Sequence, residues 1–475
     1  MISLITGLIF TLLLTRSLDK GQFGTWMFVD SVVGPFILIS GIFPFWATRF
    51  AARGKEGAIK TAVTTNLIVG LVAATVYLPF LPLIMSGFQI DSAFMIVYIL
   101  ASISILNTFL ISILEGCLRA VKPQATGYGL LIEEVVKVSL ALILIVGLKQ
   151  LLLGAIISLV VASSIQAVFY VWLLGGYLKQ KVRWVYVKEW LKGSSAFVYN
   201  AIGAQLFAST LYLLFLFGGA DSLGDYRAAT TFAVVIGYAS SLAFALYPKM
   251  LAQEDRPDDM ALSFKTMLML ALPMAAVGIT MSQSLLVILN VSYGVATPVL
   301  SLLIVDGLIV LISNFYTQCL MGAENFDEQG KISFRKLVKS KIFKVFTLPY
   351  IQAAIALPVA YWVLTHSVFS DPAQAAQSVV VITIFVHLLT FAAFYLYMHR
   401  EVKIYVAWKS TAKYILASLA IAGILYVLPQ TTTLTATFAK VFGGAGIYIV
   451  LLYAIDADAR KLFRQIWAEI RGTFR

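Results

Sequence analysis

The chain has 475 residues, of which 60% are hydrophobic and 12% are charged, and its formal net charge is +12. A soluble protein carries about twice that share of charged residues, so this composition and a mean hydropathy of +0.90 exclude an ordinary soluble domain. The basic residues lie almost entirely in connections between apolar segments. This indicates loops that face an anionic membrane leaflet and excludes a nucleic-acid-binding surface.

Apolar segments of roughly 20 residues recur from one end of the chain to the other. Each is long enough to cross about 30 Å of hydrocarbon as a helix, and none alternates polar and apolar residues as the strands of a membrane barrel do. The sequence therefore predicts an all-α polytopic membrane protein with about 14 transmembrane helices. The predicted segments cover residues 1–15, 26–46, 62–84, 93–114, 126–147, 151–177, 195–217, 228–247, 266–289, 296–318, 345–365, 375–397, 413–428 and 437–455.

Two regions are less regular than the rest. Residues 1–15 would reach only about 22 Å as a helix, at about 1.5 Å per residue. We therefore expect that the natural start lies upstream, the alternative being a short span that thins the bilayer locally. The stretch 266–318 is divided into two segments by the turn residues between Ser292 and Pro298.

Lysine and arginine are concentrated in every second connection. The connections after the even-numbered segments, together with the C-terminal tail, hold 29 of the 35 basic residues. By the positive-inside rule, this pattern places these connections and both termini in the cytoplasm of a multi-pass protein of the cell membrane. The longest basic connection is 322–344. The tail, 456–475, has apolar residues at helical spacing and is expected to form a basic amphipathic helix on the membrane surface.

The chain also repeats itself at an offset of about 200 residues. The matching runs are Gly24-Thr-Trp with Gly224-Asp-Tyr, Thr48-Arg49 with Pro248-Lys249, and Glu115-Gly-Cys117 with Thr317-Gln-Cys319. Their common order predicts two six-helix lobes related by pseudo-two-fold symmetry, an arrangement typical of alternating-access carriers. The predicted divisions are an N-terminal lobe at 1–178, a cytoplasmic linker at 179–194, a C-terminal lobe at 195–397, two extra helices at 413–455 and the tail at 456–475.

The sequence lacks the motifs of common enzymes. It has no glycine loop ending in Gly-Lys-Ser/Thr and no HExxH, and its histidines are too few and too scattered for a dedicated metal site. The three histidines are His366, His387 and His399. We therefore predict a secondary transporter that uses no cofactor and no ATP. An ion gradient, the membrane potential or the substrate's own gradient would drive it.

Acidic residues at membrane depth are candidate ion-coupling groups, because a charge there is costly unless it has a partner or a function. Asp30 lies one turn inside the second segment, just before Gly34-Pro35, where proline frees a carbonyl and bends the helix. It either lines a cavity or sits at headgroup level. Asp306 lies in the middle of its segment, and either couples an ion or makes an interhelical hydrogen bond.

The fifth segment contains a further acidic pair. Glu133 and Lys137 are four residues apart, the spacing of an ion pair on one helix face. That pairing would leave Glu134 pointing elsewhere, and Glu134 is then the freer candidate for ion coupling.

Basic and amide side chains form the candidate substrate site. Arg16 and Arg227 lie on the predicted outer side, and either bind substrate phosphate through the guanidinium fork or reach lipid headgroups. Asn200 and Gln205 either bond sugar hydroxyls or join helices. Three cytoplasmic arginines either load an anionic lipid headgroup or are ordinary positive-inside charge. They are Arg49, Arg53 and Arg119.

The motifs resemble those of a known family. The run Arg16-Ser-Leu-Asp19-Lys-Gly-Gln-Phe23-Gly24 has the form Arg-x-Leu-Gly-x-x-x-Phe/Tyr-Gly, except that Asp19 replaces the usual Gly. Further runs of the same type are Leu118-Arg119-Ala120-Val-Lys122-Pro123, Glu134-x-x-Lys137 and Gly224-Asp-Tyr226-x-Ala228-Ala229. Together they resemble the Wzx-like polysaccharide and oligosaccharide-lipid flippases of the MOP exporter superfamily, without specifying a substrate.

The resemblance implies a MATE-like fold of two lobes around a cationic cavity, with a groove for a polyprenyl tail at the last two segments. It implies movement of an undecaprenyl- or dolichyl-linked saccharide to the outer leaflet, for assembly of surface polysaccharide or glycoprotein. The implied partners are this glycan lipid, membrane lipids, H⁺ or Na⁺, and glycosyltransferases or a polymerase. No nucleic acid is among them.

Other functions fit the sequence less well. A cation-coupled multidrug exporter of the same superfamily predicts 12 spans and an acidic cavity, whereas this chain has 14 segments and several candidate cavity arginines. A membrane-embedded glycosyltransferase or polymerase would need a large outer loop with catalytic side chains, and the outer connections here are short and nearly uncharged. A scaffold that transports nothing would not explain the repeat.

Overall fold

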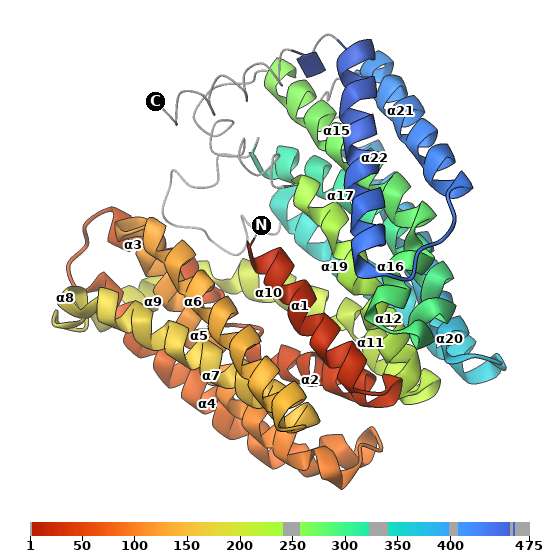
Figure 1. Ribbon diagram of the computed structural model, residues 1–475. Helices are drawn as coiled ribbons and strands as arrows, with labels where there is room; N and C mark the ends of the chain where they lie inside the picture. The colour runs from red at the N-terminus through yellow and green to blue at the C-terminus, as the bar shows by residue number, and fades with distance from the viewer. Residues whose placement is uncertain (1, 241–256, 323–340, 399–406, 457–458, 461–475) are drawn as a thin grey trace. The chain divides into compact units, whose positions relative to one another are not determined.

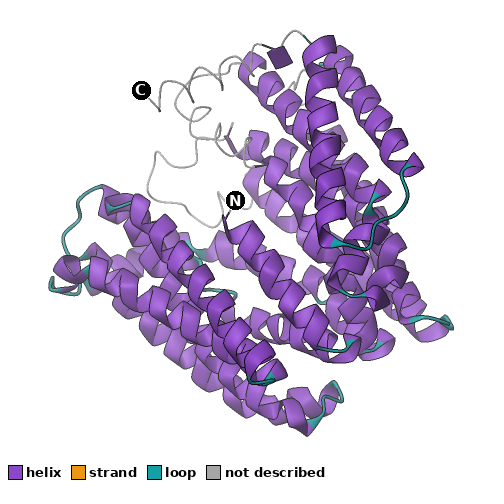
Figure 2. Cartoon of the chain, in the orientation of Figure 1, coloured by secondary structure: helices purple, strands orange, loops and turns teal. Residues whose placement is uncertain are grey.

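The described part of the protein is built from helices and contains no strand (Figure 2). The computed structural model describes residues 2–240, 257–322, 341–398, 407–456 and 459–460. The all-α fold predicted from the sequence is confirmed. The predictions for the basic connection at 323–340, for the Pro248-Lys249 match and for the tail beyond residue 460 lie outside the described residues.

The helices follow one another with short connections (Figure 1). The first part of the chain forms α1 (Ile2–Ser17), α2 (Lys20–Ile37), α3 (Ile42–Ala52), α4 (Ala58–Gly87), α5 (Met95–Val121), α6 (Gln124–Ala141), α7 (Leu151–Leu173), α8 (Gly175–Leu178), α9 (Trp184–Gly193), α10 (Ser195–Ala208) and α11 (Thr210–Leu213). The later part forms α12 (Ala220–Ala233), α15 (Pro257–Thr280), α16 (Ser282–Leu289), α17 (Thr297–Gly322), α19 (Lys341–His366), α20 (Pro372–Met398), α21 (Trp408–Val427) and α22 (Leu434–Ile455). Two short π-helices, η2 (Leu142–Gly147) and η3 (Leu214–Gly218), continue α6 and α11. The 3-10 helix η4 (Val234–Ser240) continues α12.

Each of the 14 segments predicted from the sequence overlaps a described helix. Ten helices are long and apolar enough to cross a membrane, and the bent pair of α2 and α3 is an eleventh, counted over the described residues. The remaining segments are α1, which is short, α6, which carries three charges, and α12 with η4, which leads into undescribed residues. The turn predicted between residues 266 and 318 is present, since α16 ends at Leu289 and α17 begins at Thr297.

The second segment is a broken helix. The axes of α2 and α3 differ by 62° across the break. Pro35 lies in the last turn of α2, in agreement with the usual cause of a sharp kink. The start of α2 is fixed by a capping box, in which Asp19 accepts a hydrogen bond from the Gln22 backbone N–H at 2.8 Å. Asp19, the departure from the family motif, therefore serves as an N-cap.

The chain divides into two compact units by its internal contacts. Unit 1 contains Met1–Arg227 and Gln329–Val379, and unit 2 contains Ala228–Glu328 and Val380–Arg475. Helices α12 and α20 each continue from one unit into the other. The lobe boundaries inferred from the repeat stay a prediction.

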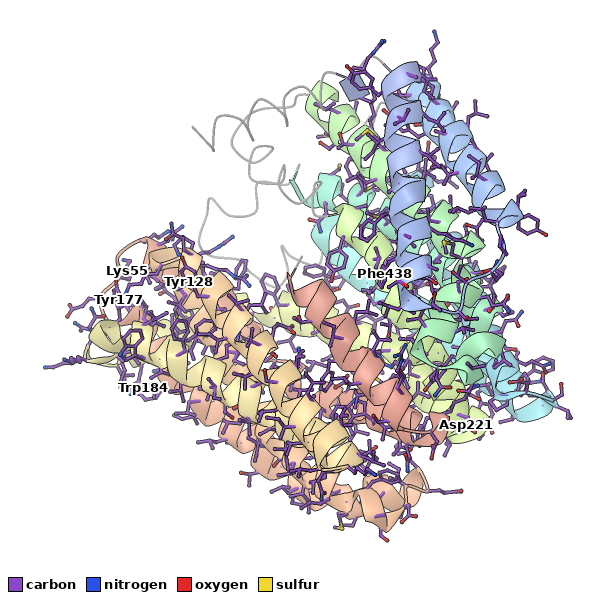
Figure 3. The ribbon with its side chains drawn as sticks, viewed as in Figure 1. Lys55, Tyr128, Tyr177, Trp184, Asp221 and Phe438 are labelled. Carbon is purple, nitrogen blue, oxygen red and sulfur yellow. The ribbon has the colours of Figure 1, made fainter. Side chains whose placement is uncertain are left out.

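Unit 1 has its core where α3, α4, α5, α7 and α9 meet. Trp190 of α9 is fully buried there, with its ring centroid 5.5 Å from that of Phe50 and 6.2 Å from that of Phe43. Lys55, Tyr177 and Trp184 mark the same end of this unit (Figure 3), the end that the charge pattern assigns to the cytoplasm.

A second contact in unit 1 joins α10 to α19. A Cβ on Gly203 would lie 2.6 Å from the Tyr350 ring, so the glycine lets this ring approach the α10 backbone. Tyr350 stacks on Tyr199 with 4.4 Å between centroids and donates its hydroxyl to the Tyr199 carbonyl at 2.7 Å. This contact fixes the helix that leads into the candidate site.

Unit 2 is organised around α15, which packs against α17 and α21. The last helix, α22, packs along α21 and is tied to α15 by the Tyr448 hydroxyl, which donates to the Met269 carbonyl at 2.7 Å. The two helices predicted to lie outside the repeat thus form part of a packed unit.

Replacement of Trp190 by alanine should destabilise unit 1 by about 3–5 kcal/mol, because it removes a fully buried indole and leaves a cavity. Trp184→Ala, on the same helix but 54% exposed, is the matched control and should cost far less. Thermal unfolding of the purified protein in detergent compares the two variants. Equal melting temperatures would contradict this account of the core.

Candidate functional site

The bend in the second segment leaves a backbone carbonyl to be satisfied by another helix. Pro35 has no N–H to donate to the carbonyl of Ser31, four residues earlier. The hydroxyl of Tyr212, from α11, donates to this carbonyl instead. Because hydrocarbon offers no water to an unsatisfied carbonyl, this bond ties α11 to α2 at membrane depth.

The same residue of α2 holds an arginine. Nη2 of Arg227 lies 3.2 Å from the hydroxyl oxygen of Ser31, to which it donates. Arg227 also interacts electrostatically with Asp30, the neighbour of Ser31. Asp30 has exposed surface although protein surrounds it closely, and Arg227 is half-buried beside it.

Gln205 of α10 completes the group. Its amide nitrogen lies 3.5 Å from the Tyr212 hydroxyl, and its side chain rests on Gly34, where a Cβ would lie only 3.0 Å from the amide oxygen. We call the five side chains of this group the α2 polar site. They are Asp30, Ser31, Gln205, Tyr212 and Arg227.

The structure thus brings together three residues that the sequence singled out separately, Asp30, Gln205 and Arg227. It adds Ser31 and Tyr212, which sequence reasoning missed. The available signal was the position of Ser31 four residues before Pro35, since that spacing identifies the carbonyl that proline leaves without a donor. Asn200 is half-buried on α10, one to two turns before Gln205.

Aromatic rings lie between the α2 polar site and the start of α2. Phe28 is fully buried and stacks on Phe215 of η3, with 4.0 Å between centroids. The Phe88 ring also packs on Phe28, with 4.9 Å between centroids. The Tyr212 ring meets Phe28 edge-on, with 5.6 Å between centroids. This aromatic packing extends from Phe215 to Tyr212.

The other predicted arginines have separate local surroundings. Arg16 is exposed at the end of α1, and Arg53 is exposed at the end of α3. The guanidinium of half-buried Arg49 lies 4.1 Å from the centre of the Phe45 ring. Arg119 pairs with Glu115 on its own helix at 3.3 Å. Arg49 is thus held over an aromatic ring.

The expectation that Glu134 points away from Lys137 is wrong. Nζ of Lys137 lies 2.8 Å from a carboxylate oxygen of Glu134 and 3.8 Å from one of Glu133. Helical spacings of three and four residues both lie on one face, so a single lysine can serve both acids. Lys137 also lies over the Phe10 ring of α1, 5.8 Å from its centre. Glu134 is therefore a paired, buried carboxylate.

Asp306 has an interhelical partner. Its Oδ1 lies 2.7 Å from Nδ1 of His387 on α20, and each side chain is 14% exposed. Asp306 is nine residues into α17, about 14 Å from the helix start at about 1.5 Å per residue. The interhelical bond is one of the two functions proposed for Asp306 from the sequence. It does not exclude the other, because an Asp–His pair can hold a proton.

In the described chain no group of three His, Cys, Asp or Glu side chains is placed to hold a metal ion. The chemistry offered by the α2 polar site is therefore that of a guanidinium, a carboxylate, two hydroxyls and an amide. These groups suit an anionic, hydroxyl-rich ligand.

Comparisons with known proteins concern the family and the fold of the chain. The family described as Polysaccharide biosynthesis protein matches residues 1–253. A search among curated protein sequences gives no match. The structure of the lipid II flippase MurJ, in an inward closed conformation, is similar with a TM-score of 0.71, at 14% identity over 97% of this chain and 98% of MurJ.

Two transporters of the MOP superfamily are also similar in fold. The inward-facing structure of a multidrug resistance MATE family transporter has a TM-score of 0.64 at 12% identity, covering 84% of this chain and 95% of the transporter. A MOP superfamily transporter from Pyrococcus furiosus has a TM-score of 0.56 at 13% identity, covering 84% of this chain and 92% of that transporter. At these identities the likeness concerns the fold, which is that of MOP superfamily transporters.

Replacement of Lys137 by methionine should destabilise the protein by about 3–5 kcal/mol, because it leaves the buried Glu134 and the half-buried Glu133 without their cation. The triple variant Lys137→Met, Glu133→Gln, Glu134→Gln should recover most of this loss, since it removes the charges together. Thermal unfolding of the two variants measures the difference. If Lys137→Met has no effect, the pairing is not structural.

Proposed function

This chain belongs to the polysaccharide biosynthesis protein family, and from this we propose that it is a flippase for lipid-linked oligosaccharides. Its substrate would be a saccharide joined to a polyprenyl phosphate or pyrophosphate, moved from the cytoplasmic to the outer leaflet. The observation that supports this most directly is Arg227, held by Ser31 of α2 beside the Asp30 carboxylate.

The α2 polar site matches both parts of such a headgroup. Arg227 is permanently charged and presents several N–H donors, which suits phosphate oxygens. Tyr212 and Gln205 supply the hydroxyl and amide that bond sugar hydroxyls. Asp30 keeps the site from being uniformly cationic, so an anion held there can also be released.

The route begins at the basic cytoplasmic end of the chain. Arg49, Arg53 and Arg119 lie at helix ends on the side that the charge pattern assigns to the cytoplasm. They would attract the anionic headgroup before it enters. The 62° break between α2 and α3 separates this region from the α2 polar site, and a change in such a break is one way in which carriers open to alternate sides.

The lipid tail needs an apolar path that stays in the bilayer. Helices α21 and α22 pack along each other and expose large apolar side chains, as expected for a surface that borders lipid. The strongly exposed ones are Trp408, Leu416, Leu419, Tyr426, Val427, Phe442 and Val450. These helices are the proposed groove for the polyprenyl chain.

Ion coupling would provide the energy. The candidates are Asp30, Glu134 and Asp306, and their surroundings differ. Glu134 is paired with Lys137, whereas Asp306 is paired with His387, whose imidazole can accept a proton. Asp306 with His387 is therefore the preferred site for H⁺ or Na⁺.

A cation-coupled multidrug exporter is the second candidate. It is favoured by the exposed carboxylate of Asp30, which would attract a cationic drug, and by the fold shared with MATE transporters. The proposed flippase differs in needing Arg227, which would repel such a drug.

Arg227→Ala should reduce protein-dependent flipping of a fluorescent short-chain polyprenyl-pyrophosphate saccharide about tenfold or more, the loss of a charge-assisted contact. Sealed proteoliposomes and an impermeant reagent measure the flipped fraction. Arg16→Ala and Arg49→Ala should also abolish flipping without lowering the amount of protein in the membrane. Arg183→Ala, an exposed arginine outside the α2 polar site, is the control.

Full flipping by Arg16→Ala, Arg49→Ala and Arg227→Ala would sink the phosphate-binding role. Movement of a cationic dye against a Na⁺ or H⁺ gradient, with no flipping by the unmodified protein, would favour the exporter.

Asp306→Asn and His387→Gln should each remove the stimulation of flipping by an imposed H⁺ or Na⁺ gradient, because each breaks the same buried pair. Rates with and without the gradient, in the same proteoliposomes, give the stimulation. Asp91→Asn changes an exposed carboxylate between α4 and α5, and this variant should keep the full stimulation of flipping. Retention of full stimulation by both variants of the pair would rule out their role in coupling.

A further inference from the structure

The segment that joins α7 to α10 is folded onto unit 1. The Gly57 backbone N–H donates to Oε1 of Gln180 at 2.7 Å, and the Arg183 backbone N–H donates to the Thr61 hydroxyl at 2.8 Å. A Cβ on Gly57 would lie only 2.4 Å from the carbonyl oxygen of Lys181, so the two backbones are in close contact. These contacts fix the beginning of the segment against the start of α4.

Helix α9 presents one face to the core of unit 1. Trp190 is fully buried on this face, and Tyr186 and Val187 pack against the same core. At the end of α9, the Ser194 hydroxyl donates to the Trp190 carbonyl at 2.5 Å and accepts from Nε1 of Trp46, on α3, at 3.0 Å. The helix is therefore held along its length and at its end, so its other face has a fixed direction.

The opposite face of α9 is exposed and mixes large apolar side chains with lysines. Trp184 is 54% exposed, Val185 72% and Leu191 56%. Lys188 and Lys192 are also exposed. At about 100° per residue, these five positions fall within an arc of about 120° around the helix axis. We call these five residues the lysine face of α9.

The segment carries an excess of positive charge. Residues 179–194 contain five basic side chains and one acidic side chain, Glu189. The basic side chains, all of them exposed, are those of Lys179, Lys181, Arg183, Lys188 and Lys192. Arg183 also pairs with exposed Glu56 at 3.7 Å. Clusters of roughly four to eight basic residues beside a membrane span or on an amphipathic helix are typical of segments that bind anionic lipids.

Exposed aromatic rings indicate the level of α9 in the membrane. Helix α7 is long and apolar enough to cross a membrane, and Trp172 in its last turn is 73% exposed. Tyr128, near the start of α6, is 62% exposed. Tyr128 and Trp184 lie at the same end of unit 1 (Figure 3). Tryptophan and tyrosine are enriched where a membrane meets water, so these rings indicate that α9 lies among the lipid headgroups.

The lysine face fits a lipid surface better than it fits a soluble protein. Protein–protein interfaces are depleted in lysine. In the headgroup region, by contrast, apolar side chains reach the acyl chains while lysines extend to the phosphates. The charge pattern assigns this end of unit 1 to the cytoplasm, and the cytoplasmic leaflet is the anionic one.

We propose that the lysine face of α9 binds anionic phospholipids of the cytoplasmic leaflet and anchors unit 1 there. Trp184, Val185 and Leu191 enter the boundary between headgroups and acyl chains, and Lys188 and Lys192 hold headgroup phosphates. Because α9 is fixed to the core, lipid bound at this face stabilises unit 1. The proposal goes beyond the proposed function, since it requires a membrane and no transport.

Quenching by brominated lipids tests the contact. In a variant whose buried cysteines, Cys117 and Cys319, are replaced by alanine, Val185→Cys carries a fluorescent maleimide. The protein is reconstituted into phosphatidylcholine with increasing fractions of dibrominated phosphatidylglycerol or, in parallel, of dibrominated phosphatidylcholine. Both lipids should quench the label. Phosphatidylglycerol should bind in preference by about tenfold, the combined effect of two lysines beside an anionic headgroup.

Matched variants identify the charges that are responsible. Lys188→Gln with Lys192→Gln should remove most of the preference for phosphatidylglycerol, whereas Lys188→Arg with Lys192→Arg keeps the charge and should retain it. Lys149→Gln changes an exposed lysine on the predicted outer side and should have no effect. Added salt should weaken the preference, because it screens surface charge. Equal quenching by the two lipids overturns the binding of anionic lipid. No quenching by either lipid leaves the lysine face to water or to another protein and overturns the whole proposal.

Thermal unfolding in detergent separates lipid binding from damage to the fold. Added phosphatidylglycerol should raise the melting temperature of the unmodified protein more than phosphatidylcholine does, since a ligand stabilises the state that it binds. Without added lipid, Lys188→Gln with Lys192→Gln should melt like the unmodified protein, because both side chains are exposed. The same variant should lose the increment from phosphatidylglycerol. An increment that survives in it would mean that the lipid binds elsewhere, and would contradict the proposal.

Discussion

The bond that the α2 polar site depends on is the one between the Tyr212 hydroxyl and the Ser31 carbonyl. A membrane helix normally satisfies its own backbone, and Pro35 makes this impossible at one carbonyl. Another helix must supply the donor, and α11 does so through Tyr212. That requirement places Gln205, on the preceding helix, against Gly34, and Arg227 against the Ser31 side chain. The bend and the polar site are therefore consequences of one missing N–H.

Helix α2 is held differently along its length. At its start, α2 is joined to α12 by the close approach of Gly24 to the Ala220 backbone and by the ion pair of Lys20 with Asp225. In its middle, Ser31 is held by Tyr212 and Arg227. Beyond Pro35 the helix breaks, and α3 packs instead against α5, in the core that contains Trp190. The bonds at Ser31 and the core that contains Trp190 therefore lie on opposite sides of the 62° break.

The sequence was enough to predict the apolar segments, but it did not predict which side chains pair with one another. Hydropathy and the alternation of basic residues predicted 14 segments, because both follow from the cost of placing charge and backbone in hydrocarbon. The repeat drew attention to Gly24 and Gly224, but not to their contact, which depends on how the two copies are folded together. Asp306 and His387 are 81 positions apart, and no local pattern predicts such a pair. Glu134 was misassigned because a helix allows both the three- and four-residue spacings to Lys137, and rotamers decide between them.

The described carboxylates at membrane depth differ in their partners and in their exposure. Glu133 and Glu134 share Lys137, and Asp306 has His387, so these charges are compensated inside the protein. Asp30 interacts with Arg227 and yet is exposed, although it lies in the middle of α2. A carboxylate can be exposed there at low cost only where water reaches it, because hydrocarbon would impose the full cost of an ion. The exposure of Asp30, more than the number of arginines, is therefore the feature that supports the proposed ligand site at this part of α2.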